Sequence, residues 1–207
     1  MIKVLLVEDR KMSQDCMTGY IKSSDRYQLA AHTQNAGMAE ILCMQNKIDL
    51  ILMDVCTANN EDGIEATAAI KRHFPNIKVI IVTGMTTIDL IDRARAAKAD
   101  SFWYKEIEGD ELLDVMDRTM NGEHIYPDKT PLVYFGNMPS TEISERELEV
   151  LRLMVEGNTD TAIAQRLFVS VPAIRYHITQ LLQKTGYENR VKLIADLINK
   201  DFIVPGL

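Results

Sequence analysis

Short apolar runs that end in polar residues recur along the first half of the chain. The clearest cover residues 2–7, 48–55 and 78–82. Runs this short, closed by turn-forming residues, are typical of strands buried on both faces, as in a parallel sheet. We expect a further strand at 27–32 and an aromatic one at 101–104.

Stretches with helical spacing of apolar residues separate these strands. We expect helices over 11–23, 35–45, 64–74, 87–97 and 110–120. Strand and helix therefore alternate five times. That alternation predicts an α/β fold, a doubly wound five-stranded parallel sheet with helices on both faces.

Only helical periods remain in the last third of the chain. Ser144 to Glu147 reads S-x-x-E, a capping box that opens a helix. A second helix is expected over 161–167 and a fourth over 190–199. The third, over 171–185, follows the N-cap residue Ser170. Two helices joined by a tight turn and braced by others predict a helix-turn-helix unit.

The stretch 122–139 interrupts both patterns. It holds Pro127, Pro131 and Pro139, half of the six prolines in the chain. Proline fixes φ and lacks an N–H donor, so neither helix nor sheet continues through this stretch. We therefore expect an α/β domain over 1–121, a linker over 122–139 and an all-α domain over 140–207.

Composition changes this picture little. The 207 residues suffice for two domains, and the 46% hydrophobic share is ordinary for globular proteins. The cysteines, Cys16, Cys43 and Cys56, are odd in number and form no C-x-x-C motif, so we expect reduced thiols in a cytoplasmic protein. We recognise no signal peptide and no apolar run long enough for a membrane span.

Charge matters more locally than in total. The net charge of −7 does not suggest a nucleic-acid binder. Between Asp160 and Glu188, however, there is no acidic residue, while Arg166, Arg175, His177 and Lys184 lie within that span. Because phosphates repel carboxylates and bind cations, this span is a candidate DNA-binding surface. The alternative is a solvated helix that lacks acids by chance.

Polar residues follow the predicted parallel strands at one edge of the sheet: Glu8 and Asp9, Asp54, Thr83, and Lys105. Ligands of open α/β sheets bind at this edge. Carboxylates that share a pocket repel one another and favour a divalent cation such as Mg²⁺. An aspartate can also attack phosphorus to form an aspartyl phosphate, whose charge a lysine ammonium would offset. The plainer alternative is a set of strand-end residues exposed to water.

These residues resemble the receiver domain of bacterial two-component response regulators. The resemblance rests on E-D after the first strand, D after the third, T-G after the fourth and K after the fifth. It implies a flavodoxin-like fold over 1–121 and phosphorylation of Asp54 by a sensor histidine kinase.

The resemblance also implies roles for the neighbouring residues. Mg²⁺ would be held by Glu8, Asp9, Asp54 and the carbonyl of Cys56. Thr83 would be the switch hydroxyl, Phe102 the switch aromatic, and Lys105 the partner of the phosphoryl group.

The chain departs from the receiver pattern after Asp54. Thr57 and Ala58 stand where receivers carry Met-Pro, and Gly63 comes one residue late, so this loop is one residue longer. Metal affinity is the property that this change puts in question. Cys56 could be read as a redox sensor, but a small buried residue is the simpler interpretation. Glu106 replaces the usual proline after Lys105, and we expect a trans peptide bond there.

The last third resembles the LuxR-type helix-turn-helix. The matching positions are Glu145, Arg146, Glu147, Gly157, Ile163, Ala164, Leu167, Ser170 and His177. The resemblance implies that the third helix enters the major groove, with DNA-facing residues Arg175, Tyr176, Thr179 and Lys184. It also implies dimerisation through the last helix, at Val191, Ile194 and Ile198, although some of these positions could instead belong to the domain's own core.

The two resemblances together indicate a NarL-type response regulator and not an enzyme. Such a protein is a cytoplasmic, DNA-binding transcription factor in which phosphorylation of Asp54 alters dimerisation and DNA binding. One alternative is a DNA-binding regulator with an atypical receiver that is not phosphorylated. Another is a magnesium phosphatase that uses Asp54, which lacks an evident second general acid and leaves the last third unexplained.

Overall fold

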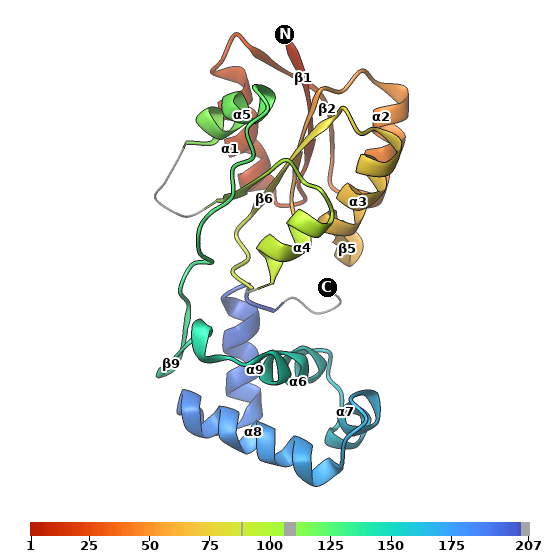
Figure 1. Ribbon diagram of the computed structural model, residues 1–207. Helices are drawn as coiled ribbons and strands as arrows, with labels where there is room; N and C mark the ends of the chain where they lie inside the picture. The colour runs from red at the N-terminus through yellow and green to blue at the C-terminus, as the bar shows by residue number, and fades with distance from the viewer. Residues whose placement is uncertain (88, 106–110, 204–207) are drawn as a thin grey trace. The chain divides into compact units, whose positions relative to one another are not determined.

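The computed structural model describes residues 1–87, 89–105 and 111–203 (Figure 1). Contacts divide the chain into two compact units. The first comprises Met1–Gly84 and Asp89–Lys129, and the second contains the chain from Thr130 onward. Each unit encloses a hydrophobic core of its own.

A five-stranded parallel sheet forms the centre of the first unit. Its strands are β1 (Ile2–Val7), β2 (Tyr27–Thr33), β3 (Leu50–Met53), β6 (Lys78–Thr83) and β7 (Ser101–Tyr104). They lie in the order β2-β1-β3-β6-β7, so the predicted sheet is confirmed. All four residues of β3 are buried, as a strand covered on both faces requires.

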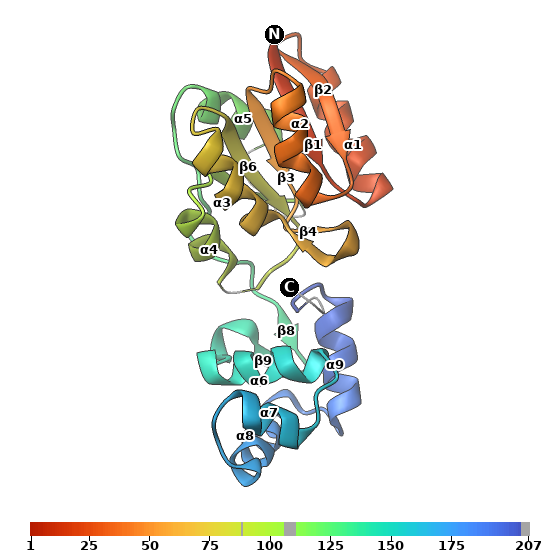
Figure 2. The same ribbon diagram turned by 90° about the vertical axis from the view of Figure 1, so that its right-hand side faces the viewer.

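Helices cover both faces of this sheet. They are α1 (Lys11–Lys22), α2 (Ala39–Gln45), α3 (Gly63–His73), α4 (Leu90–Ala96) and α5 (Leu112–Met120). Figures 1 and 2 show α1 and α5 on one face and α2 and α3 on the other. On the first face, Met17 and Ile21 of α1 and Met116 of α5 pack against β1 and β3.

Two of the predicted helices are shorter than expected. The pattern over 35–45 becomes a 3₁₀ turn (Ala36–Met38) followed by α2, and the pattern over 87–97 becomes α4, which begins at Leu90. Residue 88, and residue 110 at the start of the pattern before α5, lie outside the described residues.

The longer loop after Asp54 folds into a small hairpin. Its strands, β4 (Cys56–Thr57) and β5 (Glu61–Asp62), pair antiparallel. Asn59 and Asn60 turn the chain with φ of 65° and 57°. Asparagine tolerates this left-handed conformation better than most residues. Strands of two residues have no readable periodicity, and the sequence therefore predicted only a loop.

The second unit combines a hairpin with four helices in the described residues (Figure 2). They are β8 (Tyr134–Phe135), β9 (Met138–Pro139), α6 (Glu145–Val155), α7 (Asp160–Arg166), α8 (Val171–Thr185) and α9 (Arg190–Asn199). The predicted capping box at Ser144 and the predicted N-cap at Ser170 are both present. Gly186 ends α8 in the left-handed conformation, with φ of 77°.

The apolar end of the predicted linker belongs to this second core. Phe135 is fully buried, with its ring 4.6 Å from that of Phe202, and Met138 is buried beside it. The hairpin therefore contributes to the fold instead of floating free. Among the described helices, none has the length and hydrophobicity to cross a membrane.

Candidate functional site

Three carboxylates meet at the carboxyl edge of the sheet. Ligand oxygens of Glu8, Asp9 and Asp54 all lie within 4.8 Å of one another. Glu8 is fully buried and Asp54 is 5% exposed. For Glu8 and Asp54, the interpretation as strand-end residues exposed to water is therefore wrong.

Lys105 joins this cluster, as the strand order predicted. Its Nζ lies 2.5 Å from Glu8 Oε2 and 2.8 Å from Asp54 Oδ2. The pairing of β7 with β6 places it there, because the Lys105 N–H donates to the Thr83 carbonyl at 2.9 Å. Residues 97 and 51 positions away from Lys105 thus become its ion-pair partners.

Burial shifts the protonation of this cluster. Loss of water around the carboxyl raises the pKa of Asp54 to about 7, and neighbouring Glu8 adds to the rise while Lys105 opposes it. Burial disfavours the charged form of Lys105 too, yet Asp54 and Glu8 together raise the pKa of its ammonium. Lys105 therefore stays charged and holds the two acids together.

The cluster fits a divalent cation. Asp9 Oδ1 is buried and accepts no hydrogen bond from any described residue. Glu8 Oε1 is oriented by the Arg10 N–H at 2.9 Å. Buried acceptors rarely stay unsatisfied, and hard cations prefer such carboxylate oxygens. Cys56, whose carbonyl the receiver resemblance adds to this set, lies two residues after Asp54 in β4.

The loop after Asp54 is held close by a glycine. Gly63 N–H donates to the Val55 carbonyl at 2.9 Å, and a Cβ on Gly63 would lie 1.9 Å from the Asp54 carbonyl oxygen. Asp62 then caps α3 through the N–H groups of Ile64 and Glu65. The extra residue thus leaves Asp54 beside a tightly packed turn.

Sequence reasoning missed an ion pair on this loop. The second oxygen of Asp62 binds Arg93 of α4, which lies 31 positions away. An aspartate just before a helix signals the cap, but no periodicity signals so distant a partner. This pair links the loop that follows Asp54 to α4.

The expected switch residues lie on neighbouring strands. Thr83 is fully buried at the end of β6, opposite Tyr104 of β7. Phe102 is 1% exposed, and its ring lies 4.8 Å from that of Tyr104 and 6.5 Å from that of Tyr126. Their switch roles remain predictions. The expected trans bond between Lys105 and Glu106 falls outside the described residues.

The third helix of the second unit, α8, presents one exposed stripe. It consists of Pro172, Arg175, Tyr176, Thr179 and Gln183, at helical spacing. Arg175 reaches towards Asp160 at 3.4 Å, but 71% of its side chain remains exposed. Thr179 donates its hydroxyl to the Arg175 carbonyl at 2.8 Å within the helix. The stripe holds three of the four residues that the sequence predicted to face DNA, namely Arg175, Tyr176 and Thr179.

Lys184 has a structural partner that the sequence did not suggest. Its Nζ lies 2.6 Å from Oε1 of Glu147, the acid of the capping box. Although burial opposes the charge, Lys184 and Ser144 together lower the pKa of Glu147. Lys184 thus has a structural role in the domain, and its contact with DNA remains a prediction.

The three residues of α9 that were predicted to form a dimer interface differ in how exposed they are. Val191 is 70% exposed and Ile198 is 37% exposed. Ile194 is partly buried against the domain's own core. Two of the three positions are thus open to a partner.

Comparison with known proteins decides the family. The model of the response regulator receiver domain matches residues 4–117, more than half of the chain. That of bacterial regulatory proteins of the LuxR family matches residues 141–196. The chain belongs to the LuxR-type response regulators. Response regulators of this type are DNA-binding transcription regulators and not enzymes, so the phosphatase interpretation is excluded.

Relatives span nearly the whole response regulator. VraR of Staphylococcus aureus, a response regulator protein, is 26% identical over 198 residues, which cover 93% of this chain and 94% of VraR. VraR of Staphylococcus epidermidis matches equally well. Receiver domains generally bind Mg²⁺ in an acidic pocket, and here that pocket is the cluster of Glu8, Asp9 and Asp54.

Solved structures share the fold of the response regulator. RcsB of Salmonella enterica serovar Typhimurium, bound to a promoter in the presence of the phosphomimetic BeF3⁻, matches with a TM-score of 0.63 at 19% identity, covering 95% of this chain and 97% of that one. ChrA, from a heme-sensing two-component system, matches with a TM-score of 0.53 at 22% identity, covering 96% and 97%.

Proposed function

We propose that this response regulator is a transcription factor whose DNA binding is controlled by phosphorylation of Asp54 by a sensor histidine kinase. The observation that carries the proposal is the convergence of Lys105, Glu8 and Asp9 on the Asp54 carboxylate. Unrelated strand-end residues would have no reason to bring three carboxylates and a lysine ammonium together in one largely buried cluster.

The chain's own groups suit phosphoryl transfer. One Asp54 oxygen attacks the phosphorus of a phosphohistidine, an O–P bond forms as the P–N bond breaks, and the imidazole leaves with a proton from solvent. The Val55 N–H, 2.7 Å from Asp54 Oδ1, orients the carboxylate. The Lys105 ammonium, already bonded to Asp54 Oδ2, offsets the charge of the phosphoryl oxygens.

Glu8, Asp9, Asp54 and the Cys56 carbonyl are the groups that would hold Mg²⁺. The unsatisfied Asp9 Oδ1 supports this assignment. Bound there, Mg²⁺ would supply positive charge to the transferring phosphoryl group. Thr83, at the end of the neighbouring strand β6, and Phe102, on the next strand β7, then respond to the new charge and acceptor oxygens.

The second unit is the proposed DNA-binding part. The exposed stripe of α8 with Arg175, Tyr176 and Thr179 would enter the major groove, and Lys184 would contact phosphate. Val191 and Ile198, exposed on α9, together with Ile194 would pair two copies in a homodimer. Among the described residues the three cysteines form no disulfide, as in a reducing compartment, so we propose that this DNA-binding protein acts in the cytoplasm.

Phosphodonor labelling tests the first step. With Mg²⁺ and a small-molecule phosphodonor, we expect the intact mass of wild type to gain one phosphoryl group and that of Asp54→Ala to stay unchanged. Asp114→Asn, an exposed aspartate on α5, serves as the matched control and labels like wild type. An unlabelled wild type contradicts the proposal.

A DNA footprint tests the second step. DNA fragments selected by the protein from a random pool are titrated with phosphorylated and unphosphorylated protein. We expect phosphorylation to change the affinity and the extent of the footprint. Equal affinities in both states would instead support the alternative, an atypical receiver that is not phosphorylated. The longer loop after Asp54 is the observation that suggests this alternative.

A further inference from the structure

The open edge of the receiver sheet is covered by the chain that leaves α5. Gly122, with φ of 93°, ends the helix and turns the chain back. Residues 123–126, which we call the edge segment, then run beside β7, the last strand of the sheet. The edge segment lies within the first unit and leads directly into the proline-rich stretch.

Hydrogen bonds tie the edge segment to β7 and to the turn before it. The Phe102 N–H donates to the Ile125 carbonyl at 2.8 Å, and the Ile125 N–H donates to Ser101 Oγ at 3.1 Å. The Tyr126 hydroxyl donates to the Ala99 carbonyl at 2.7 Å, and His124 Nδ1 donates to the Asp100 carbonyl at 2.9 Å. The segment is therefore bonded to four consecutive residues.

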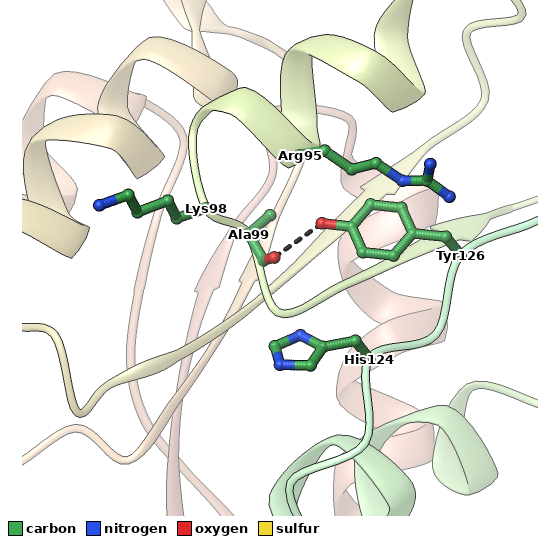
Figure 3. Close-up of a pocket in the computed structure, with 5 residues that line it drawn as sticks. All are labelled: Arg95, Lys98, Ala99, His124 and Tyr126. Carbon is green, nitrogen blue, oxygen red and sulfur yellow. Dashed lines mark hydrogen bonds between the residues drawn. The ribbon is translucent and has the colours of Figure 1, made fainter.

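Tyr126 anchors the end nearest the linker. Figure 3 shows its hydroxyl directed at Ala99 and its ring beneath Arg95, whose guanidinium carbon lies 4.8 Å from the ring centroid. Burial raises the pKa of Tyr126 to about 12, so the hydroxyl remains a donor at neutral pH. The ring also lies 6.5 Å from that of Phe102.

The edge segment is held by these few contacts and not by deep burial. Tyr126 and His124 line an open hollow of about 500 Å³ together with Arg95, Lys98 and Ala99 (Figure 3). His124 is exposed, and Ile125 and Tyr126 are only partly buried. Segments with few buried apolar contacts open at low free energy, which suits an element that moves during signalling.

We propose that the edge segment passes the state of Phe102 to the linker, with Tyr126 as the positioning residue that holds the segment against β7 and the turn before it. The inference rests on the proposed function, because it needs Thr83 and Phe102 to respond to phosphorylation. Movement of Phe102 strains the bond from its N–H to Ile125, and the shift reaches Pro127 through the next two peptide units. A segment that merely covers the sheet edge would show no such response.

Amide hydrogen exchange of the full chain tests the movement. The protein is measured alone and with BeF3⁻ and Mg²⁺. We expect the amides of Phe102 and Ile125 to exchange faster in the BeF3⁻ state, while that of Leu5, on the interior strand β1, does not. Unchanged exchange at Phe102 and Ile125, in a protein whose DNA affinity does respond to BeF3⁻, overturns the inference.

A double-mutant cycle tests the coupling. The readout is the ratio of DNA affinities with and without BeF3⁻, in wild type, Tyr126→Phe, Phe102→Leu and the double variant. Tyr126→Phe removes one hydrogen bond, so we expect the ratio to fall by a factor of roughly 3 to 10. Because both residues act on one route, the effect of the second substitution is smaller in the presence of the first.

The control is Tyr134→Phe, the same change at a 54% exposed tyrosine of the second unit, and it leaves the ratio unchanged. Wild-type ratios in Tyr126→Phe, or strictly additive effects in the cycle, overturn the inference while the proposed function stands. A wild-type protein that does not respond to BeF3⁻ overturns both.

Discussion

Lys105 supplies the positive charge that allows two buried carboxylates to lie side by side. Its side chain is 13% exposed and bonds to both Glu8 and Asp54. Removal of one member of a buried charge cluster leaves the others uncompensated, which costs more than the loss of a surface ion pair. The stability of the receiver should therefore depend on this residue.

We expect Lys105→Gln to lower the free energy of unfolding by on the order of 3 kcal/mol when divalent cations are removed. Added Mg²⁺ should stabilise the variant more than wild type, because it supplies the missing positive charge. Urea unfolding with EDTA and with MgCl₂ measures both effects. Lys98→Gln, at an exposed position, is the control, and equal stabilisation of wild type and Lys105→Gln by Mg²⁺ would falsify this account.

At the scale of elements, the turn from β3 into α3 sets the surroundings of Asp54. The hairpin β4–β5 absorbs the extra residue, and α3 begins at Gly63 against the Asp54 backbone. Glu61 in this hairpin accepts hydrogen bonds from Asn35 and Gly37 of the β2–α2 connection. The longer loop is therefore ordered by partners on several sides.

Gly63→Ala tests how tight this turn is. Its Cβ would meet the Asp54 carbonyl at 1.9 Å, so the backbone has to shift. We expect a loss of roughly 1–3 kcal/mol in unfolding free energy and slower phosphodonor labelling of Asp54.

Gly19→Ala in α1 is the matched control for Gly63→Ala. No atom lies within 4 Å of a Cβ at Gly19, and alanine favours a helix over glycine by about 0.5–1 kcal/mol. Thermal unfolding and intact-mass labelling of both variants give the comparison. Similar behaviour of the two variants would mean that Gly63 is not required by its contact with Asp54.

At the scale of the whole molecule, a protein with a negative net charge has to bind DNA, which is itself negatively charged. The net charge of −7 opposes DNA, and the stripe on α8 offers few cations. Among the cations of α8, Arg175 is mostly exposed, whereas Lys184 is bonded to Glu147. Because few cations are available to contact phosphates, the affinity for DNA should fall only shallowly as the salt concentration rises.

We expect Arg175→Gln to reduce the slope of log affinity against log salt by about 1, the value for one lost phosphate contact. Lys184→Gln should reduce the slope less and lower the stability of the second unit more, because its partner Glu147 is buried in the capping box. Anisotropy titrations at several salt concentrations decide between them. Equal losses of slope would show that Lys184 contributes to DNA binding as fully as Arg175.

Local signals in the sequence were enough for much of the fold. Strands β1 and β7 and helix α9 have the predicted bounds, because apolar runs and helical spacing need no distant partner. Caps at Ser144 and Ser170 followed from residues within four positions. The meeting of Lys105 with Asp54 followed as well, since parallel strands bring their carboxyl ends to one edge.

Contacts between distant residues were decided only by the tertiary structure. The pairs Asp62 with Arg93 and Glu147 with Lys184, and the edge segment on β7, join residues whose spacing carries no period. The sequence by itself determined which elements form and which chemistry gathers at the sheet edge, because backbone geometry repeats along the chain. Folding alone decided which charged side chains pair and how deeply Asp54 is buried, because those depend on packing among elements that no local pattern records.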